Sequence, residues 1–250
     1  MKTIGILGAG WLGKPLALFL QQKGHQVKVS VRLEEKKNQL QNSGLSSFVL
    51  QIDQNEIQGD LSFFNKVDVL IISLTPQQIS VFKTLLEIVK QYNIQKVILF
   101  SSTGIYTDCS GKVNEDRLLQ LHVPKVKLLK EIEDVFLNES SISATIFRLG
   151  GLIGPNRNPV TFLAKKEFIE EGNEPVNVAY QETIIETISA LLNKEIPNTV
   201  FNITEDDHRT KEAFYTEAAQ QKGLILPNFK YSTNPKNRIV LNDKIKDFLR

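Results

Sequence analysis

The sequence predicts an α/β fold built on a doubly wound parallel sheet, with a small C-terminal portion attached to it. Short apolar segments alternate with segments of helical periodicity along the first 150 residues, and this alternation favours parallel strands joined by crossover helices. Residues 69–72 and 97–100 are apolar without interruption, as expected of strands that are covered on both faces. We therefore predict a first domain over residues 1–150 and a smaller portion over 151–250, from which one strand and one helix return to the sheet.

The first half of the expected sheet contains three strands. Residues 3–7 are an apolar run that ends in glycines, and a helix at 14–23 has its apolar residues at helical spacing before Gly24 stops it. Residues 26–31 alternate apolar and polar side chains, which is typical of a strand. A helix at 34–42 and a strand at 47–52 complete this half.

The second half repeats the alternation. Residues 67–74 are apolar and β-branched, which predicts a strand, and 77–91 has apolar residues at helical spacing. A strand at 96–100, a long helix within 118–138 and a strand at 143–147 follow. Beyond them we expect a loop rich in Gly, Pro and Asn at 150–159. Two further helices are expected at 182–192 and 210–222, with a last strand between them at 199–203.

The composition is that of an ordinary globular protein and excludes several classes. The 250 residues are 41% hydrophobic and 23% charged, with a formal net charge of +2, so a long disordered chain is excluded. No block of basic residues indicates a nucleic-acid partner. The single cysteine excludes an internal disulfide, and the three histidines do not have the spacing of metal ligands.

The location expected from the sequence is the cytoplasm. No apolar run reaches the roughly 18 residues of a membrane span. Lys2 is the only basic residue of the N-terminal stretch, and glycines interrupt its apolar residues, which argues against a signal peptide. We expect a monomer or homodimer with a small-molecule substrate and without a membrane or nucleic-acid partner.

The first chemical motif is the turn Gly8-Ala9-Gly10-Trp11-Leu12-Gly13, which follows the first strand and opens the first helix. In that context the pattern predicts a dinucleotide site. Gly8 makes the tight turn, Gly10 lets the backbone approach a pyrophosphate, and Gly13 lets helix and strand pack closely. The helix N-terminus then offers N–H groups to the phosphates.

The end of the second strand indicates which dinucleotide is preferred. An acidic residue that binds the ribose of NAD is expected near Val31, but Ser30, Val31 and Arg32 stand there. A guanidinium can bind a 2′-phosphate through two hydrogen bonds, which favours NADP over NAD. Two alternatives stay open: Arg32 can be a solvated surface residue, and Glu34 or Glu35 can bind the ribose.

Further cofactor contacts are expected at the carboxyl ends of the strands, where ligands bind in an open parallel sheet. Together with the turn, the expected cofactor-binding residues are Gly8, Gly10, Trp11, Leu12, Gly13, Ser30, Arg32, Asp53, Leu74, Thr75, Ser101 and Gly150.

Three motifs together resemble the NAD-dependent epimerase/dehydratase family, and the chain looks closer to the atypical members of these extended short-chain dehydrogenases/reductases. They are the glycine turn, the segment Ser101-Ser102-Thr103-Gly104-Ile105-Tyr106, and the segment from Arg148 to Pro155. The resemblance covers most of the chain. It implies a Rossmann domain, a nicotinamide dinucleotide and a C-terminal substrate-binding portion.

The family's catalytic residues carry over only in part. Its Ser or Thr corresponds to Ser102 or Thr103, depending on whether one counts from Tyr106 or from Phe100. Its Tyr-x-x-x-Lys pair does not carry over. If Lys127 takes the Lys place, Val123 takes the Tyr place; if the helix is aligned on Glu133, Lys125 and Leu129 occupy the two places.

Tyr106 is the remaining candidate for a general acid. It is the only tyrosine in the loops that end strands four to six, and a nearby cation such as Lys127 would be needed for it to act as a base near neutral pH. The alternative is that Tyr106 packs and its hydroxyl caps a loop. His122 lies close to the expected catalytic helix and is a weaker candidate.

Two functions follow from these observations. The first is an NADP-dependent oxidoreductase or a nucleoside-sugar epimerase/dehydratase-like enzyme that acts on a small polar substrate. The second is a non-catalytic NADP(H)-binding sensor or regulatory protein, which the missing Tyr-x-x-x-Lys pair favours.

Overall fold

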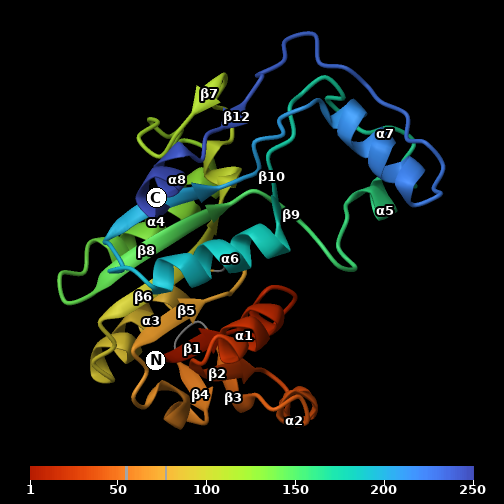
Figure 1. The fold of residues 1–250 in the computed structure, drawn as a ribbon. Coiled ribbons are helices and arrows are strands. Elements are labelled where there is room, and N and C mark those ends of the chain that lie inside the picture. The colour runs from red at the N-terminus through yellow and green to blue at the C-terminus, as the bar shows by residue number, and fades with distance from the viewer. Residues whose placement is uncertain (54–55, 77) are drawn as a thin grey trace. The chain divides into compact units, whose positions relative to one another are not determined.

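A computed structural model describes residues 1–53, 56–76 and 78–250. Within these residues the main sheet has eight strands in the order β11-β8-β6-β5-β1-β2-β3-β4 (Figure 1). The strands are β1 (Thr3–Leu7), β2 (Gln26–Val31), β3 (Ser46–Ile52), β4 (Ile57–Gly59), β5 (Val69–Ile72), β6 (Lys96–Ser102), β8 (Ser143–Leu149) and β11 (Thr199–Ile203). The sheet is mostly parallel, as predicted, and β4 runs antiparallel to β3.

The strand order reverses between β1 and β5, which both pair with their neighbours in parallel. After β1 the chain therefore adds β2 and β3 on one side of β1. After β5 it adds β6 and β8 on the other side. At such a switch point the loops that leave the carboxyl ends diverge and form a crevice for ligands. The glycine turn leaves β1 at this point.

The chain divides into two compact units. The first comprises residues 1–101, 127–147 and 185–200, and the second 102–126, 148–184 and 201–250. The units interleave along the chain, so they do not follow the expected boundary at residue 150. The reason is that β6, β8 and β11 each begin in the first unit and end in the second.

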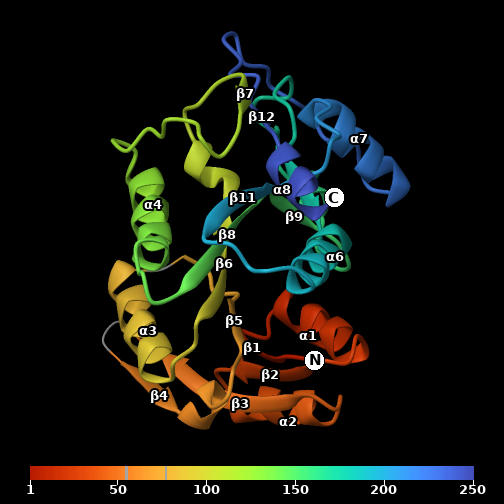
Figure 2. The same cartoon turned by 60° about the vertical axis from the view of Figure 1, so that its left-hand side comes forward.

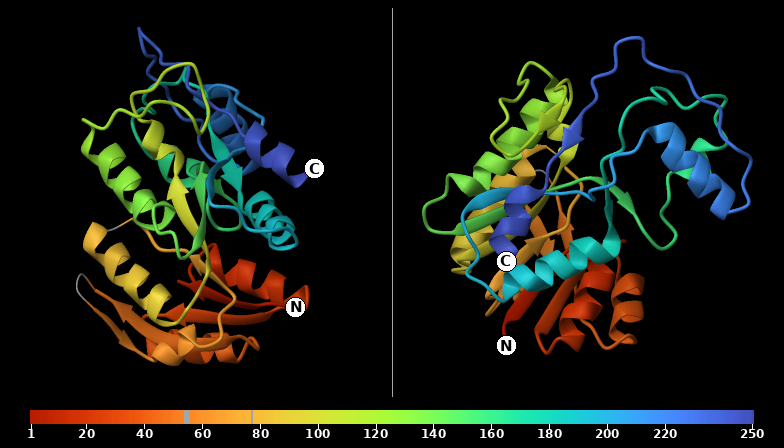
Figure 3. Two further views of the ribbon diagram at one scale, coloured as in Figure 1. Left: turned by 90° about the vertical axis from the view of Figure 1, so that its left-hand side faces the viewer. Right: turned by 45° about the horizontal axis from the view of Figure 1, so that its top comes forward.

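Helices cover both faces of the sheet in the first unit. Helices α1 (Gly13–Gln22) and α6 (Gln181–Leu192) lie on one face, and α3 (Ile79–Gln91) and α4 (Pro124–Leu137) lie on the other (Figures 2 and 3). Between sheet and helices, buried side chains of β5 and β6 pack with Phe82 and Phe136 in one core cluster. Helix α2 (Glu34–Gln41) and the 3₁₀ turn Leu61–Phe64 complete the unit.

The second unit is built from short elements. Strand β7 (Lys112–Val113) pairs with β12 (Ile239–Val240), and β9 (Gly151–Ile153) pairs with β10 (Val178–Tyr180), both in parallel. Helix α5 (Val160–Leu163) packs on α7 (Lys211–Gln221) through Val160, Ala218 and Ala219. Helix α8 (Asp243–Leu249) closes the chain.

Some expected elements have other bounds. The helix expected within 118–138 begins at Pro124, because proline has no N–H to contribute and is favoured in the first helical turn. The loop expected at 150–159 contains β9, and the aperiodic tail contains β12 and α8. Helix α3 begins at Ile79, and Gln77, where we expected its start, lies outside the described residues.

Candidate functional site

The glycine turn has three glycines with three different surroundings. Gly8 has a φ of +102°, and a Cβ there would lie 2.8 Å from the Ser73 carbonyl oxygen. A Cβ on Gly13 would lie 2.1 Å from the Gly8 carbonyl oxygen, so helix α1 can pack this close only with glycine. A Cβ on Gly10 would meet nothing within 4 Å. Gly10 therefore borders open space, which is where the pattern predicts the pyrophosphate.

Ser30 of β2, which we expected to contact the cofactor, forms hydrogen bonds with the backbone of the glycine turn. Its hydroxyl accepts a hydrogen bond of 3.0 Å from the Gly8 N–H, and its carbonyl oxygen accepts one of 2.9 Å from Ala9. The side chain is buried. Ser30 thus holds the backbone of the turn in place, a positioning role that the sequence did not indicate.

The N-terminus of α1 follows directly. Leu12 occupies the N-cap position, and no side chain caps the helix. The first N–H groups of a helix lack intrahelical acceptors and attract anions. Lys14 N–H already donates to the Gly10 carbonyl oxygen, and open space at Gly10 beside a helix N-terminus that no side chain caps fits the pyrophosphate of a dinucleotide.

The other expected cofactor residues of the first unit stand at the ends of their strands. Arg32 follows β2 and is exposed, and Thr75 after β5 is also exposed, whereas Leu74 beside it is half-buried. Asp53 follows β3, is exposed, and donates its N–H to the Glu56 carbonyl oxygen. Ser101, near the end of β6, is buried and donates a 2.6 Å hydrogen bond to Glu133 Oε1 of α4.

In the second unit, Tyr106 is the centre of a buried hydrogen-bond network. Arg148 Nη1 donates to the Tyr106 hydroxyl, which donates to Asn202 Oδ1, and both distances are 2.8 Å. The N–H of Asn202 donates to Glu115 Oε1 over 2.7 Å. The Tyr106 side chain is 0% exposed, an arrangement that matches the packing alternative rather than a group that meets a substrate.

The pKa shift of Tyr106 also favours a packing role over a catalytic one. Burial raises the pKa of Tyr106, although Arg148 and Asn202 act in the opposite direction. Burial also raises the pKa of Glu115. A raised pKa keeps the phenol neutral and works against a role as base.

The cation at the Tyr106 hydroxyl is therefore Arg148, and not Lys127 as we expected. Lys127 has a side chain that is 63% exposed, and its ammonium lies 3.9 Å from Glu131 Oε1, one helical turn away. An arginine inside the strand 143–149, beside the apolar residues Ile146, Phe147 and Leu149, was the signal in the sequence, since a buried guanidinium requires partners.

The loop after β6 carries the two hydroxyls that the family resemblance singles out. Thr103 Oγ1 donates to the Leu149 carbonyl oxygen over 3.3 Å, whereas Ser102 Oγ accepts a 3.0 Å hydrogen bond from the Gly104 N–H. The proton of Thr103 is committed to a backbone acceptor. Ser102 is engaged as an acceptor and keeps its own proton available.

Lys125 stands over this loop. A Cβ on Gly104 would lie 3.0 Å from Lys125 Nζ and 3.2 Å from Ser102 Oγ, so ammonium and hydroxyl flank the same point. Lys125 lies in the first turn of α4, and Val123 precedes the helix. Of the two alignments considered for this helix, the one through Glu133 thus places a chemically active side chain at the loop.

Gly150 contributes packing. A Cβ there would lie 2.7 Å from the Asn177 carbonyl oxygen and 3.0 Å from the Val178 carbonyl carbon. The Gly150 N–H donates to the Ile203 carbonyl oxygen over 2.9 Å. A glycine is required at position 150 because any side chain would collide with the backbone of residues 177–178, which lies close by in the second unit.

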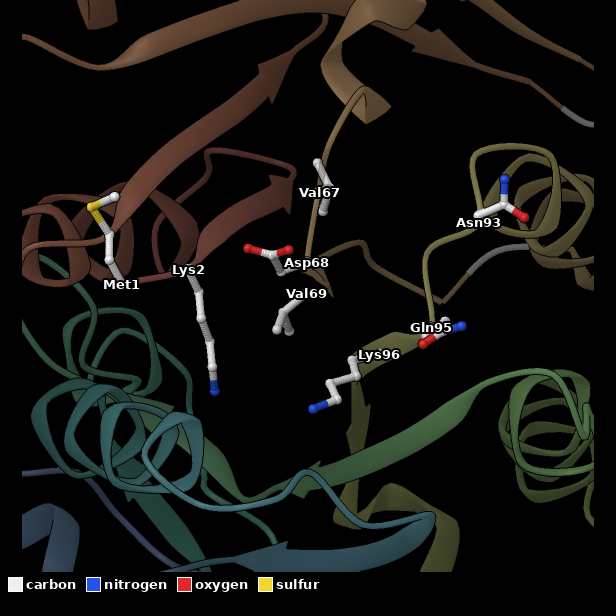
Figure 4. Close-up of a pocket in the computed structure, with 8 residues that line it drawn as sticks. All are labelled: Met1, Lys2, Val67, Asp68, Val69, Asn93, Gln95 and Lys96. Carbon is white, nitrogen blue, oxygen red and sulfur yellow. The ribbon is translucent and has the colours of Figure 1, made fainter.

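A cavity of about 420 Å³ lies at the opposite edge of the sheet, where β1, β5 and β6 begin (Figure 4). Lys2 and Lys96 point into it beside Asp68. Lys2 Nζ donates to the Leu192 carbonyl oxygen at the C-terminus of α6, and Asp68 accepts a 2.7 Å hydrogen bond from the Thr3 N–H. These polar groups join elements at the amino ends of parallel strands, away from the edge where ligands of such sheets bind.

No helix of the described residues is long and apolar enough to cross a membrane. Across the same residues, no group of three or more His, Cys, Asp or Glu side chains could hold a metal ion. Cys109 is buried and unbridged.

Comparisons with known proteins agree with this geometry. The Escherichia coli K12 protein YeeZ is 30% identical over 98% of this chain and 93% of its own. A functionally unknown conserved protein from Silicibacter pomeroyi superimposes with a TM-score of 0.81 at 22% identity, over 100% of this chain and 92% of that one. The UDP-glucuronic acid 4-epimerase of Bacillus cereus, solved with NAD, has a TM-score of 0.80 at 22% identity, over 98% and 89%.

The two solved structures show the fold, a Rossmann-like one shared with NAD-dependent epimerases. A family model described as NAD(P)H-binding matches residues 8–179, a span that begins at the first glycine of the turn and ends in β10. With the glycine geometry and the 30% identical relative, the chain belongs to the NAD(P)H-binding family.

Proposed function

We propose that the protein is an NADP-dependent oxidoreductase or epimerase-like enzyme that acts on a small polar substrate. The observation that carries the proposal is the turn at Gly8–Gly13, where Gly8 and Gly13 are forced by close backbone contacts and Gly10 borders open space. When bound there, the dinucleotide supplies hydride-transfer chemistry. The chain's own residues bind it, select it and orient the substrate.

Selection of NADP is proposed for Arg32. It follows β2 directly, is exposed, and has Val31 where an acidic residue would serve NAD. A guanidinium at this position offers two parallel N–H groups to a 2′-phosphate. Ser30 acts indirectly, because its hydroxyl holds the Gly8 N–H.

Polarisation of the substrate is proposed for Ser102 and Lys125. The Ser102 hydroxyl keeps its proton available and Lys125 Nζ flanks the same point above Gly104. Lys125 forms no ion pair with any residue that the structure describes. A hydroxyl and an ammonium in this arrangement can donate to the oxygen of a carbonyl group and deliver a proton to it when the carbonyl is reduced. Tyr106 keeps a structural role in this proposal.

The test compares two lysines of one helix. Purified protein is incubated with NADPH and a panel of carbonyl compounds that includes nucleotide sugars, and loss of NADPH absorbance is followed. Lys125→Met is expected to lower turnover by about 10²–10⁴, the range for a positioned acid or base, with NADPH affinity retained. Lys127→Met is the matched control, since Lys127 is exposed and paired with Glu131, and it should change turnover less than about twofold. Equal rates in both variants would overturn the assignment of Lys125.

The second candidate is a non-catalytic NADP(H) sensor. It is favoured by the burial of Tyr106, which leaves no tyrosine hydroxyl available in the loop after β6. If NADPH binds tightly and no compound of the panel is turned over by the parent protein, this candidate replaces the enzyme.

A further inference from the structure

The cavity at the amino edge of the sheet, which the proposed function does not use, is lined by two lysines that come from neighbouring strands. All its lining residues belong to the first unit. Lys2 precedes β1, Asp68 precedes β5, and Lys96 is the first residue of β6. In the sheet β5 lies between β1 and β6, and it is parallel to both. The strand order therefore places one lysine on either side of the aspartate.

The two lysines extend toward the same open space. In Figure 4 their ammonium groups lie on the same side of Asp68 and are directed into the cavity. Both lysines are half-buried and line the cavity, so a ligand can reach them from solvent. The volume of about 420 Å³ falls within the roughly 300–1,000 Å³ that is usual for small-molecule sites. The cavity therefore has room for a small molecule as well as for a single ion.

Most of the N–H donors on these lysines are not used by the protein. Lys2 Nζ donates one hydrogen bond, to the Leu192 carbonyl oxygen. Lys96 Nζ forms neither a hydrogen bond nor an ion pair with any residue that the structure describes. Asp68 accepts a 2.7 Å hydrogen bond from the Thr3 N–H and, among the same residues, forms no ion pair with either lysine. Since an ammonium has three donors, the unused capacity of the cavity is donor capacity on two cations.

The field at Lys2 has the sign that attracts an anion. The pKa of Lys2 is lowered, first by burial and next by the charge of Lys96, and the attraction of Asp68 opposes these effects more weakly. The repulsion that Lys96 exerts on Lys2 thus exceeds the compensation by Asp68. An anion beside the two ammonium groups would relieve this repulsion, because an opposite charge favours the charged form of a lysine.

We propose that this cavity binds a phosphate group, free or carried by a small molecule, with Lys2 and Lys96 as its cationic ligands. An ammonium is a compact point charge with rotatable donors, so two lysines from different strands suit oxygens that point in several directions. A flat carboxylate is matched best by the fork of an arginine, and the described lining residues include none. A phosphate monoester carries a charge of about −1.5 to −2 near pH 7, which balances two ammonium groups.

This site is separate from the dinucleotide site. The cavity lies where β1 begins, whereas the glycine turn follows the end of the same strand. The five residues of β1 span about 17 Å at the rise of a β-strand, so a ligand that fills the cavity does not reach the turn. The proposal therefore does not depend on the dinucleotide or on turnover.

The experiment follows backbone amide signals around the cavity. ¹⁵N-labelled full-length protein without dinucleotide is titrated with inorganic phosphate, glycerol 3-phosphate and acetate, each against sodium chloride of equal ionic strength. Saturable shifts at residues 67–69 and 95–96 are expected with at least one phosphate compound, and the one that binds more tightly shows whether the group is free or esterified. Acetate that binds as tightly as phosphate would overturn the proposal. So would shifts confined to residues 10–14, which would place the anion at the glycine turn, or no saturable shift at all.

Three variants keep the test falsifiable. Lys96→Met removes the unpaired cation and should weaken the phosphate affinity by about tenfold. Lys90→Met is the control: it changes the net charge equally, but Lys90 is already paired with two glutamates, and the affinity should stay unchanged. Asp68→Asn keeps an oxygen for the Thr3 N–H and removes the competing negative charge. It should strengthen binding by about two- to fivefold, a gain that misfolding cannot imitate. An unchanged affinity in both Lys96→Met and Asp68→Asn would contradict the assignment.

Discussion

At the residue scale, the glycine turn shows how one pattern combines two requirements. Gly8 and Gly13 are glycines because a Cβ would collide with backbone at 2.8 Å and 2.1 Å, so they serve the fold. Gly10 has no such neighbour within 4 Å, so the fold does not require it. We propose that Gly10 is a glycine because a ligand approaches its Cα.

This difference separates stability from binding. Gly10→Val should keep the melting temperature within a few degrees and abolish NADPH binding, because the side chain would occupy the space of the pyrophosphate. Gly13→Val should destabilise the protein by several kcal/mol, since overpacking against backbone cannot relax easily. Thermal unfolding and calorimetric titration of both variants are the measurements. Normal NADPH affinity in Gly10→Val would contradict the site.

Arg32 tests the choice of dinucleotide. Arg32→Ala should weaken the affinity for NADPH by about tenfold to a hundredfold, because a charge-assisted hydrogen bond contributes roughly 1.5–3 kcal/mol. NADH affinity should stay nearly unchanged, since NADH has no 2′-phosphate. Titration of both dinucleotides into parent and variant gives the answer, and equal losses would show that Arg32 does not bind the 2′ position.

Tyr106 separates packing from catalysis. Tyr106→Phe removes the hydroxyl between Arg148 Nη1 and Asn202 Oδ1, both at 2.8 Å. Two buried polar atoms then lose a partner, and a loss of stability of about 1–3 kcal/mol is expected. Chemical denaturation measures it. A variant with parent stability that has lost turnover would instead restore Tyr106 as the proton donor.

At the scale of elements, long periodic segments could be predicted from the sequence and short ones could not. Strands such as β5 and helices such as α3 bury a continuous or periodic apolar face, which is a local property of the sequence. Strands β7, β9, β10 and β12 have two or three residues, too few to show a period. The start of α4 was predictable from Pro124, but its alignment depends on contacts with distant residues, such as that between Glu133 and Ser101.

The bond between β6 and α4 provides a test at this scale. Ser101→Ala should lower the free energy of unfolding by about 1–2 kcal/mol, because the buried Glu133 carboxylate loses a 2.6 Å donor. Ser141→Ala is the control: Ser141 is exposed and bonds only its neighbour Glu139 among described residues. Denaturant unfolding should show an effect for Ser101 alone; similar stabilities would mean that the helix is held by its apolar face.

At the scale of the whole molecule, the units interleave, and this limits what a sequence can reveal of the site. The glycine turn is local, so its pattern predicted its geometry. Arg148, Asn202 and Glu115 come from three separate segments of the second unit, and Lys125 becomes notable only through its approach to Gly104. Side chains brought together by the fold leave no common signal in the sequence.

The C-terminal tail is the part of the chain whose structural role was least visible in its sequence. Strand β12 pairs with β7. Asn202 Nδ2 donates to the Leu241 carbonyl oxygen and Thr204 Oγ1 to that of Val240, each over 2.9 Å. Asn242 Nδ2 returns a 2.6 Å hydrogen bond to Thr204. The tail therefore satisfies buried polar groups of β11 and the residues after it.

Removal of residues 239–250 should consequently unfold much of the second unit. Three side-chain hydrogen bonds contribute about 1 kcal/mol each, and Val240 and Ile245, which are 0% and 5% exposed, about 1.5–3 kcal/mol each. Their sum is comparable with the 5–15 kcal/mol that stabilise a typical domain. Limited proteolysis of the shortened chain should then cut within 148–184 and 201–238, whereas deletion of Arg250 alone, which is exposed and bonds Asp247, should leave the digestion pattern unchanged. A shortened chain as resistant to protease as the parent would show that the second unit is held together without its tail.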